Sequence, residues 1–250
     1  MNLDVRGVFR DAWSMWRRDR GVLVAIAGFF LFLPQLAGFL FLPGHVEIAS
    51  KAAAQADVNA QAQAIVAFYS QNAPLIIATG LTTLFGALVI LMLYVDREKR
   101  DVAGILLFAL RRLPAYFLLS LVIDGMVRIG VATLVLIIPA LYLAGRLLLA
   151  GVIMASEPRS GPFVAIAQSF RLTRGRGVIL AGFAAIIVFG LLLAYPVIAL
   201  GDVLDRAPLA NPVSALIIDV VAALIIAAGM LGGILLRVAL YRRIASSNGI

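Results

Sequence analysis

Long uncharged apolar runs constrain this chain more than any other feature. Three of them contain no Asp, Glu, Lys or Arg: Gly21 to Gly44, Asn72 to Val95, and Gly177 to Gly201. A helix needs about 20 mostly apolar residues to cross the hydrocarbon layer of a bilayer, so each run is long enough to cross once. Hydrophobic residues make up 63% of the 250 residues, more than a water-soluble core of this size can bury. The sequence therefore predicts a membrane protein.

Two longer apolar stretches carry a few charges and supply the remaining crossings. Leu113 to Ser156 is long enough for two helices, and we expect the turn at Pro139 because proline interrupts helical hydrogen bonding. Pro212 to Leu240 is long enough for one helix, and we group Arg237, near its end, with Arg242 and Arg243 as cytoplasmic charges. We therefore predict an all-α polytopic protein with six transmembrane helices, forming one integral membrane domain over residues 1–250. The expected spans are 22–43, 73–95, 113–138, 140–156, 177–200 and 212–240.

The basic residues indicate how the chain is oriented. Most of the 21 Lys and Arg residues precede the first span, lie between spans two and three or four and five, or follow the last span. Cytoplasmic loops keep an excess of positive charge, so we expect both termini in the cytoplasm of a bacterium and the protein in its inner membrane. Because this charge lies beside membrane spans, it favours membrane lipids over nucleic acid as partners.

Three segments next to the spans have the apolar spacing of amphipathic helices. We expect interfacial helices over 3–19, 101–111 and 161–174, of which the first places Val8, Ala12 and Met15 on one face. An interfacial helix followed by a two-span hairpin then occurs at 3–72, 101–140 and 161–240. This pattern fits three divergent repeats, although convergence of membrane-surface segments explains it equally well.

The exterior segment between Gly44 and Asn72 is rich in Ala and Gln. It is expected to be partly helical, because Val58, Ala62 and Tyr69 share one helical face with Ile65. That face can lie on the outer surface of the bundle, or the segment can be a plain spacer.

A motif between spans four and five resembles a known family. It reads Glu157-Pro158-Arg159-Ser160-Gly161-Pro162, then Ala165-Ile166-Ala167-Gln168-Ser169-Phe170-Arg171-Leu172-Thr173-Arg174-Gly175. It is similar to the membrane domain attached to some bacterial glycerophosphoryl diester phosphodiesterases, which also occurs alone in bacterial inner-membrane proteins. The resemblance implies the six-span plan and an inner-membrane location. It implies no activity, because the soluble catalytic domain is absent from this sequence.

The same motif has two physical interpretations. In the structural one, Ser160 or Gly161 caps a surface helix, Pro162 begins it and Gly175 ends it with a positive φ. In the functional one, side chains of the motif bind lipid phosphate at the cytoplasmic interface. The candidate lipid contacts are Ser169, Arg171, Thr173, Arg174 and Arg176.

Four ionisable residues are expected inside the bilayer: Asp124, Arg128, Arg146 and Asp219. Asp124 and Arg128 are four residues apart, so they share a helical face and can pair. A lone charge in the membrane costs several kcal/mol, so these residues form either a functional polar network or structural pairs. Gly229 and Gly233 add a Gly-x-x-x-Gly pair, which marks either dimerisation or packing within the chain.

Catalytic residue types are scarce. The chain has no Cys and one His, His45, so we expect no metal site, no cofactor and no catalytic constellation. The leading hypothesis is a non-catalytic membrane protein that interacts with lipids or serves as a scaffold for a membrane partner, or for a second copy of itself. The alternative is a small transporter or permease that uses the intramembrane Asp and Arg residues. An intramembrane hydrolase based on Asp124 and Asp219 ranks last.

Overall fold

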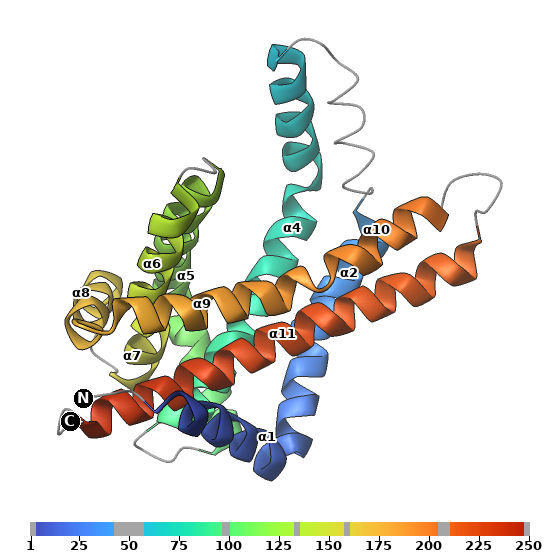
Figure 1. Ribbon diagram of the computed structural model, residues 1–250. Helices are drawn as coiled ribbons and strands as arrows, with labels where there is room; N and C mark the ends of the chain where they lie inside the picture. The colour runs from blue at the N-terminus through green and yellow to red at the C-terminus, as the bar shows by residue number, and fades with distance from the viewer. Residues whose placement is uncertain are drawn as a thin grey trace.

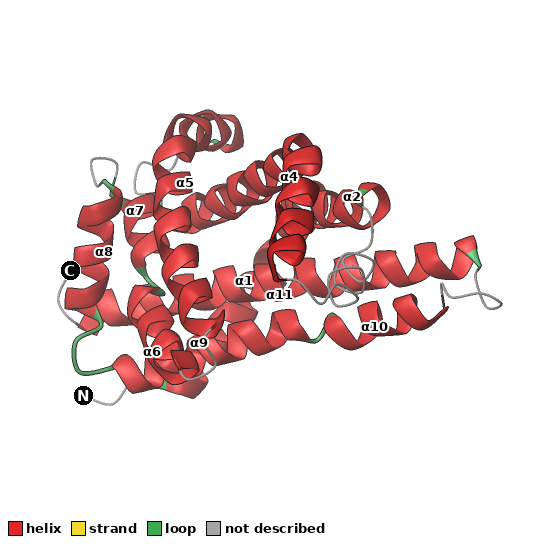
Figure 2. Cartoon of the chain, turned by 90° about the horizontal axis from the view of Figure 1, so that it is seen from above, coloured by secondary structure: helices red, strands yellow, loops and turns green. Residues whose placement is uncertain are grey.

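The computed structural model describes residues 4–42, 58–96, 101–132, 136–157, 161–204 and 211–247. Within these ranges the chain is helical apart from short turns, and it contains no strand (Figures 1 and 2). The elements in chain order are α1 Val5–Ala27, η1 Gly28–Phe32, α2 Leu33–Phe41, α4 Val58–Val95, α5 Val102–Ala132, α6 Ile137–Leu147, α7 Ala150–Ser156, α8 Pro162–Leu172, α9 Gly177–Leu192, α10 Tyr195–Leu204 and α11 Pro212–Ser247.

In the described part of the chain, six helical segments are long and apolar enough to cross a membrane. They are Val5–Phe41, Ala62–Val95, Val102–Gly125, Ile137–Ser156, Gly177–Gly201 and Pro212–Ser246. The predicted class, an all-α polytopic membrane protein, is therefore confirmed.

A kink at Asp19 divides α1 into two parts. Asp19 has φ −111° and ψ 17°, outside the helical region, and its carboxylate accepts hydrogen bonds from Arg18 and from the Tyr94 hydroxyl. The segment before the kink lies across the molecule near both termini, whereas the segment after it rises along the bundle (Figure 1). The kink thus lies between the expected interfacial helix 3–19 and the first span. Residues 5–18 form the interfacial half of α1.

The first span stays helical through Pro34. Proline has no N–H, and its ring displaces the carbonyl four residues earlier. Directly before it, η1 is a π-helical turn in which the Leu33 N–H donates to the Gly28 carbonyl, five residues back. The wider turn accommodates the proline, so η1 and α2 continue the span without a break.

The middle of the chain differs from the prediction in three ways. α5 runs from Val102 through Pro114 to Ala132 without interruption, so 101–111 is not a separate interfacial helix. Pro139 lies in the first turn of α6 and not between two helices. The first turn tolerates a proline, because the N–H groups there have no acceptor within the helix. The expected span 140–156 is divided into α6 and α7 by a turn at Leu148 and Leu149.

The described part of the exterior segment, from Val58 onward, and the second span form one helix, α4, of 38 residues. The first half of α4 extends away from the other helices (Figure 1), and Tyr69 is 56% exposed. It therefore does not lie on the outer surface of the bundle. Its Ala and Gln residues favour a helix but offer few large apolar groups for packing. Residues 43–57 and the side chains of Val58 and Ile65 lie outside the described set.

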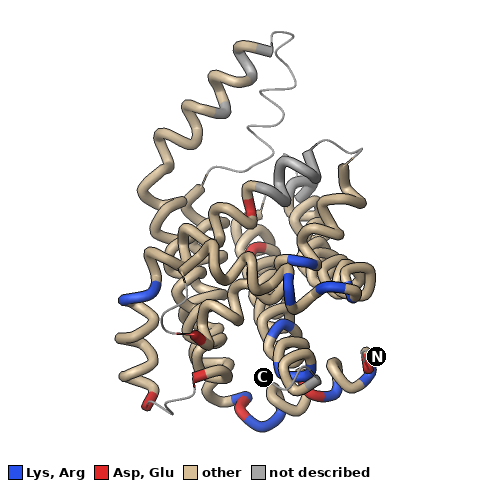
Figure 3. The backbone as a smooth tube through the Cα atoms, turned by 90° about the vertical axis from the view of Figure 1, so that its left-hand side faces the viewer, with Lys and Arg blue, Asp and Glu red and all other residues tan. Residues whose placement is uncertain are grey.

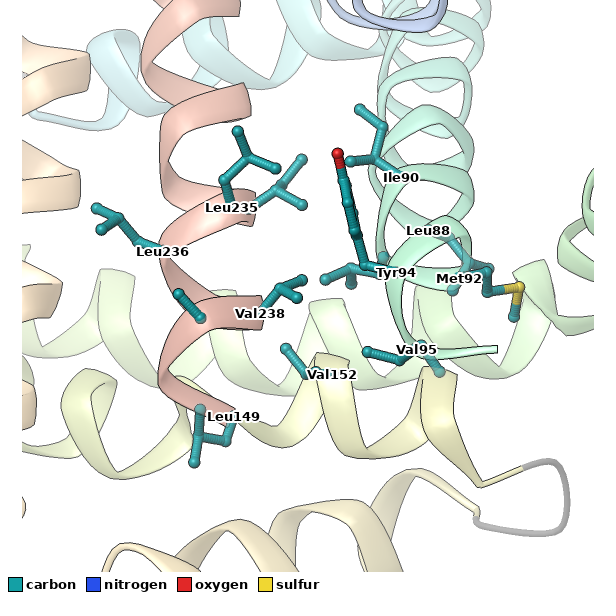
Figure 4. Close-up of a cluster of buried hydrophobic side chains, with 14 of the residues drawn as sticks. Leu88, Ile90, Met92, Tyr94, Val95, Leu149, Val152, Leu235, Leu236 and Val238 are labelled. Carbon is teal, nitrogen blue, oxygen red and sulfur yellow. The ribbon is translucent and has the colours of Figure 1, made fainter. Parts of the chain in front are cut away.

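The densest core lies between α4, α7 and α11 (Figure 4). Leu88, Leu149 and Val238 are fully buried there, and the ring of Tyr94 stands between α4 and α11.

Two arginines near the end of α11 bind other parts of the chain. Arg242 donates to the Tyr94 carbonyl and lies over the Tyr94 ring. Arg243 links the end of α11 to α1. It donates to Asp11 at 2.6 Å and to Asp4 at 3.1 Å, which fastens the interfacial half of α1 to the end of α11.

Glycines bring α9 close to two other helices. A Cβ at Gly145 of α6 would overlap the backbone of α9 at Leu180 and Ala181. A Cβ at Gly229 of α11 would lie 3.2 Å from the Gly190 carbonyl oxygen, and one at Gly233 would lie 3.0 Å from Ile187. The Gly229 and Gly233 pair therefore packs α11 against α9 within the chain.

The expected threefold repeat is only partly reflected in the helices. In the first unit a kink precedes the span, and in the third a turn at residues 173–176 separates α8 from α9. The second unit, 101–140, begins with the continuous helix α5 and has no such break.

Candidate intramembrane binding site

Of the four expected intramembrane charges, the structure describes the side chains of Asp124, Arg146 and Asp219. The Arg128 side chain, and with it the expected Asp124–Arg128 pair, lies outside the described set. Arg146 turns toward α8: its guanidinium donates to the Phe170 carbonyl at 2.6 Å and lies 5.2 Å from the centre of the Phe170 ring. Asp219 lies in the third turn of α11 and is half-buried. Of the three described side chains, that of Asp124 alone lines the cavity described below.

Two of the five candidate lipid contacts are placed differently from the prediction. Ser169 and Thr173 are fully buried, so their hydroxyls do not face a lipid surface. Ser169 donates to the Arg146 carbonyl at 2.7 Å, and Thr173 donates to the Ser169 carbonyl at 2.6 Å. Arg146 lies in the last turn of α6, where backbone carbonyls lack a hydrogen-bond donor within the helix. The Ser169 hydroxyl, from outside the helix, is such a donor. The Ser169 hydroxyl therefore holds α8 against α6, and Thr173 adds a longer contact of 3.4 Å to the same Arg146 carbonyl.

The basic members of the motif stay near the surface. Arg171 and Arg174 are exposed and Arg176 is half-buried, so they remain candidate contacts for lipid phosphate. The start of α8 follows the structural interpretation of the motif, whereas the helix ends earlier than expected, at Leu172, and Gly175 lies in the turn after it. Gly161 caps α8, Pro162 begins it, and Gly175 has φ +78°. Ser160 lies outside the described set.

A cavity of about 240 Å³ lies among the membrane-spanning helices, between α5, the α6–α7 turn, α9 and α11. Its lining is mostly apolar and includes four polar side chains. The lining residues are Tyr116, Leu119, Ser120, Ile123, Asp124, Ala144, Leu147, Leu148, Gly151, Ala184, Ile187, Val188, Leu191 and Arg237. The cavity thus combines a cation and a carboxylate with an aliphatic wall.

The polar groups of the cavity come from one face of α5 and from one residue of α11. Tyr116, Ser120 and Asp124 are each four residues apart, so they form a stripe along α5 that is about 12 Å long. Of these three residues, Tyr116 is buried. The opposite wall, from Ile187 to Leu191 on α9, is aliphatic.

Arg237 is the unexpected member of this site. It lies between the buried residues Leu236 and Val238, and its Nε is a buried donor with no hydrogen-bond partner among the described residues. The sequence contained the signal, because Arg237 is flanked on both sides by apolar residues just as Asp124 is. Sequence reasoning instead grouped it with Arg242 and Arg243 as a cytoplasmic charge. Yet it lies about 7 Å deeper along α11 than Arg242.

The arrangement suits recognition of an amphiphile. A guanidinium that lines a largely apolar cavity binds an anionic oxygen strongly, because water competes little there. Ser120 and Tyr116 can donate to or accept from further oxygens, and Asp124 accepts from a hydroxyl or ammonium group. A buried donor without a partner costs roughly 1–3 kcal/mol, which a ligand oxygen at Arg237 would recover.

The fold and this cavity define a polytopic all-α membrane protein with an intramembrane polar site. No family model, no curated protein and no solved structure matches the chain. The resemblance to the phosphodiesterase membrane domain stays a prediction.

Proposed function

We propose that this chain is a non-catalytic integral membrane protein that holds the polar end of a membrane lipid in the Arg237 cavity. The observation that carries the proposal is the buried Arg237 Nε, a donor without a partner among the described residues that borders a cavity with an aliphatic wall. A phosphate oxygen of a glycerolipid suits the guanidinium, and an acyl chain suits Ile187, Val188 and Leu191.

Binding fits this site better than catalysis. A hydrolase that shares a proton between two carboxylates needs both within a few ångströms of each other. Asp219 does not line the cavity that Asp124 lines, and it lies about 27 Å along α11 from Arg237. The remaining groups, a guanidinium and two hydroxyls, are typical of recognition.

Cysteine chemistry tests the proposal, because the chain contains no native cysteine. Ser120→Cys places one thiol in the cavity, and Ser246→Cys places one on the exposed end of α11 as a control. In vesicles of phosphatidylethanolamine and phosphatidylglycerol, we expect the thiol of the S120C variant to react with a membrane-permeant maleimide and to resist a charged thiosulfonate. The control should react with both reagents.

The role of Arg237 is tested by measuring lipid phosphorus that stays with the protein after washing in detergent. Arg237→Met keeps the bulk of the side chain and removes the charge, so it should retain less phosphorus than the wild type. Arg237→Lys keeps the charge and should retain an intermediate amount. A loss of a charge-assisted hydrogen bond corresponds to at least about tenfold weaker binding. Equal retention by R237M and the wild type, with R237M folded, would contradict the proposal.

A small transporter is the second candidate, and two helix breaks favour it. The turn at Leu148 and Leu149 separates α6 from α7 at the cavity wall, and the turn at Leu193 and Ala194 separates α9 from α10. Interrupted helices of this kind expose backbone groups that can bind a solute. Rapid labelling of the S120C thiol by charged reagents added to either side of the membrane would favour transport over lipid binding.

We also propose that both termini face the bacterial cytoplasm and that the protein belongs to the inner membrane. The Lys and Arg residues drawn in blue lie in the half of the molecule that carries both termini (Figure 3), which supports this orientation. A reporter protein that fluoresces only in the cytoplasm, fused after Ile250, should be fluorescent. A dark cytoplasmic reporter together with an active periplasmic one would reverse the assignment.

A further inference from the structure

A second hollow lies outside the Arg237 cavity, between the interfacial half of α1 and α11. This groove has a volume of about 450 Å³ and an almost wholly apolar surface. Its lining residues are Phe9, Ala12, Trp13, Trp16, Ala228, Leu231, Gly232, Leu235 and Leu236. Trp13 is 61% exposed, and Phe9 stacks on Phe183 of α9 with ring centres 5.6 Å apart. The groove therefore has a fixed apolar floor and an exposed aromatic rim.

A basic stripe borders this rim. Arg10 and Arg17 lie three residues before and four residues after Trp13, so both neighbour it on the helix surface. Arg6 lies one further turn along the same side, and all three arginines are exposed. The acidic residues of this helix lie on another side, where Asp11 is bonded to Arg243. Positive charge is thus collected on one edge of the groove.

We propose that this groove binds an anionic glycerophospholipid, with one acyl chain over Gly232 and Leu235 and the phosphate at the arginine stripe. Tryptophan rings are favoured at the depth of lipid headgroups, and an amphipathic helix with arginines beside its apolar face suits a negatively charged leaflet. The site uses α1 and α11, whereas the Arg237 cavity lies between α5, α6, α9 and α11. This second lipid site goes beyond the proposed function, and an experiment can disprove binding at either site without affecting the other.

The chain provides its own probe for this groove. It contains two tryptophans, and both line the groove. Bromine atoms on lipid acyl chains quench tryptophan fluorescence on contact, so quenching reports lipid in the groove. The full-length protein is reconstituted in phosphatidylcholine vesicles that contain increasing fractions of dibrominated phosphatidylglycerol, or of dibrominated phosphatidylcholine as the neutral counterpart. Each arginine near an anionic surface contributes roughly a factor of five in binding, so half-maximal quenching should need at least about fivefold less of the anionic lipid.

One pair of variants tests the groove itself. A Cβ at Gly232 has no atom within 4 Å, so Gly232→Leu adds an apolar side chain that starts in open space and extends into the groove. Gly182→Leu on α9 also meets open space, but it lies outside the groove and is the matched control. In G232L, half-maximal quenching should need at least about fivefold more of the anionic lipid than in the wild type. G182L should need the same fraction as the wild type. Thermal unfolding of both variants checks that each is folded.

A second pair tests the charge. Arg10→Gln with Arg17→Gln should remove most of the anionic preference, while Arg111→Gln, at an exposed arginine of α5 that lines neither the groove nor the Arg237 cavity, should keep it. Equal quenching by the two brominated lipids in the wild type, or unchanged quenching in G232L, would overturn the proposal in favour of nonselective boundary lipid. Protection of the tryptophans from both lipids, together with a dimer mass, would overturn it in favour of a second copy of the chain.

Discussion

The close contact between α6 and α9 at Gly145 allows us to predict how much a substitution there lowers the free energy of unfolding. In Gly145→Ala the new methyl group would overlap the backbone of Leu180 and Ala181, which cannot rotate away as a flexible side chain can. Overpacking of this kind costs about 1–3 kcal/mol, and the rigid neighbour places the cost near 3 kcal/mol. Replacing a helical glycine by alanine returns about 1 kcal/mol of helix propensity. The net destabilisation expected for G145A is therefore about 2 kcal/mol.

Gly182 provides the matched control, because a Cβ there meets no atom within 4 Å. Gly182→Ala keeps the propensity gain without the overlap, so the two variants should differ by about 3 kcal/mol. At about 2–4 °C per kcal/mol for chains of this length, G145A should unfold about 6–12 °C below G182A. Thermal unfolding followed by far-ultraviolet circular dichroism in one nonionic detergent measures the difference. A Tm for G145A equal to or above that of G182A would refute the close α6–α9 contact.

Two further predictions concern the hydrogen bonds that fasten α8 and α1. Ser169→Ala removes the hydroxyl that donates to the Arg146 carbonyl, so it should lower the free energy of unfolding by about 1–3 kcal/mol. Ser246→Ala, at an exposed hydroxyl, is the control and should stay within about 0.5 kcal/mol of the wild type. Thermal unfolding measures both differences. The Gly7 N–H and the Arg243 guanidinium lower the pKa of Asp4, so this carboxylate stabilises the fold above its ordinary pKa near 4 and stops doing so as the pH falls through the lowered value. Asp4→Asn, which still caps the helix, should therefore lower Tm slightly at pH 7, and this difference should vanish as the pH falls through the lowered pKa. A difference in Tm that does not shrink with falling pH would contradict the charge pair.

The sequence predicts the membrane class well because one physical quantity dominates it. A run of about 20 uncharged apolar residues has few alternatives to crossing a bilayer, and Gly177–Gly201 shows how little else is needed. The start of α8 at Pro162 and the positive φ of Gly175 in the turn that follows the helix are also predictable, because capping and turn preferences act locally.

Prolines are harder to interpret from sequence alone. Pro139 is expected to end a helix and instead lies in the first turn of one, while Pro114 lies within α5 without ending it. In both cases the cost of a missing N–H depends on whether that N–H would have had a partner. In a membrane helix, neighbouring helices can also satisfy the freed carbonyls.

Only part of the cavity can be predicted from the sequence, because its polar residues are brought together by the packing of helices that are distant in the chain. Asp124 is recognisable as an intramembrane charge, but nothing local to it shows that Arg237, 113 residues later, lines the same cavity. Arg146 illustrates the opposite error. It lies in an apolar stretch as Asp124 does and its Nε is buried, yet its guanidinium donates to the Phe170 carbonyl of α8 and does not line the cavity.

The motif of α8 supports the cavity without touching its polar groups. Ser169 donates to the carbonyl of Arg146, at the end of α6, and the next two residues, Leu147 and Leu148, line the cavity. One helical turn further on, a Cβ at Gly151 would lie 3.3 Å from the Tyr116 hydroxyl oxygen, so the small residue leaves that hydroxyl its place beside the cavity. The Ser169 hydrogen bond therefore fixes α8 against the end of α6, which forms one wall of the cavity. A motif without catalytic residues can thus help to position an intramembrane binding site.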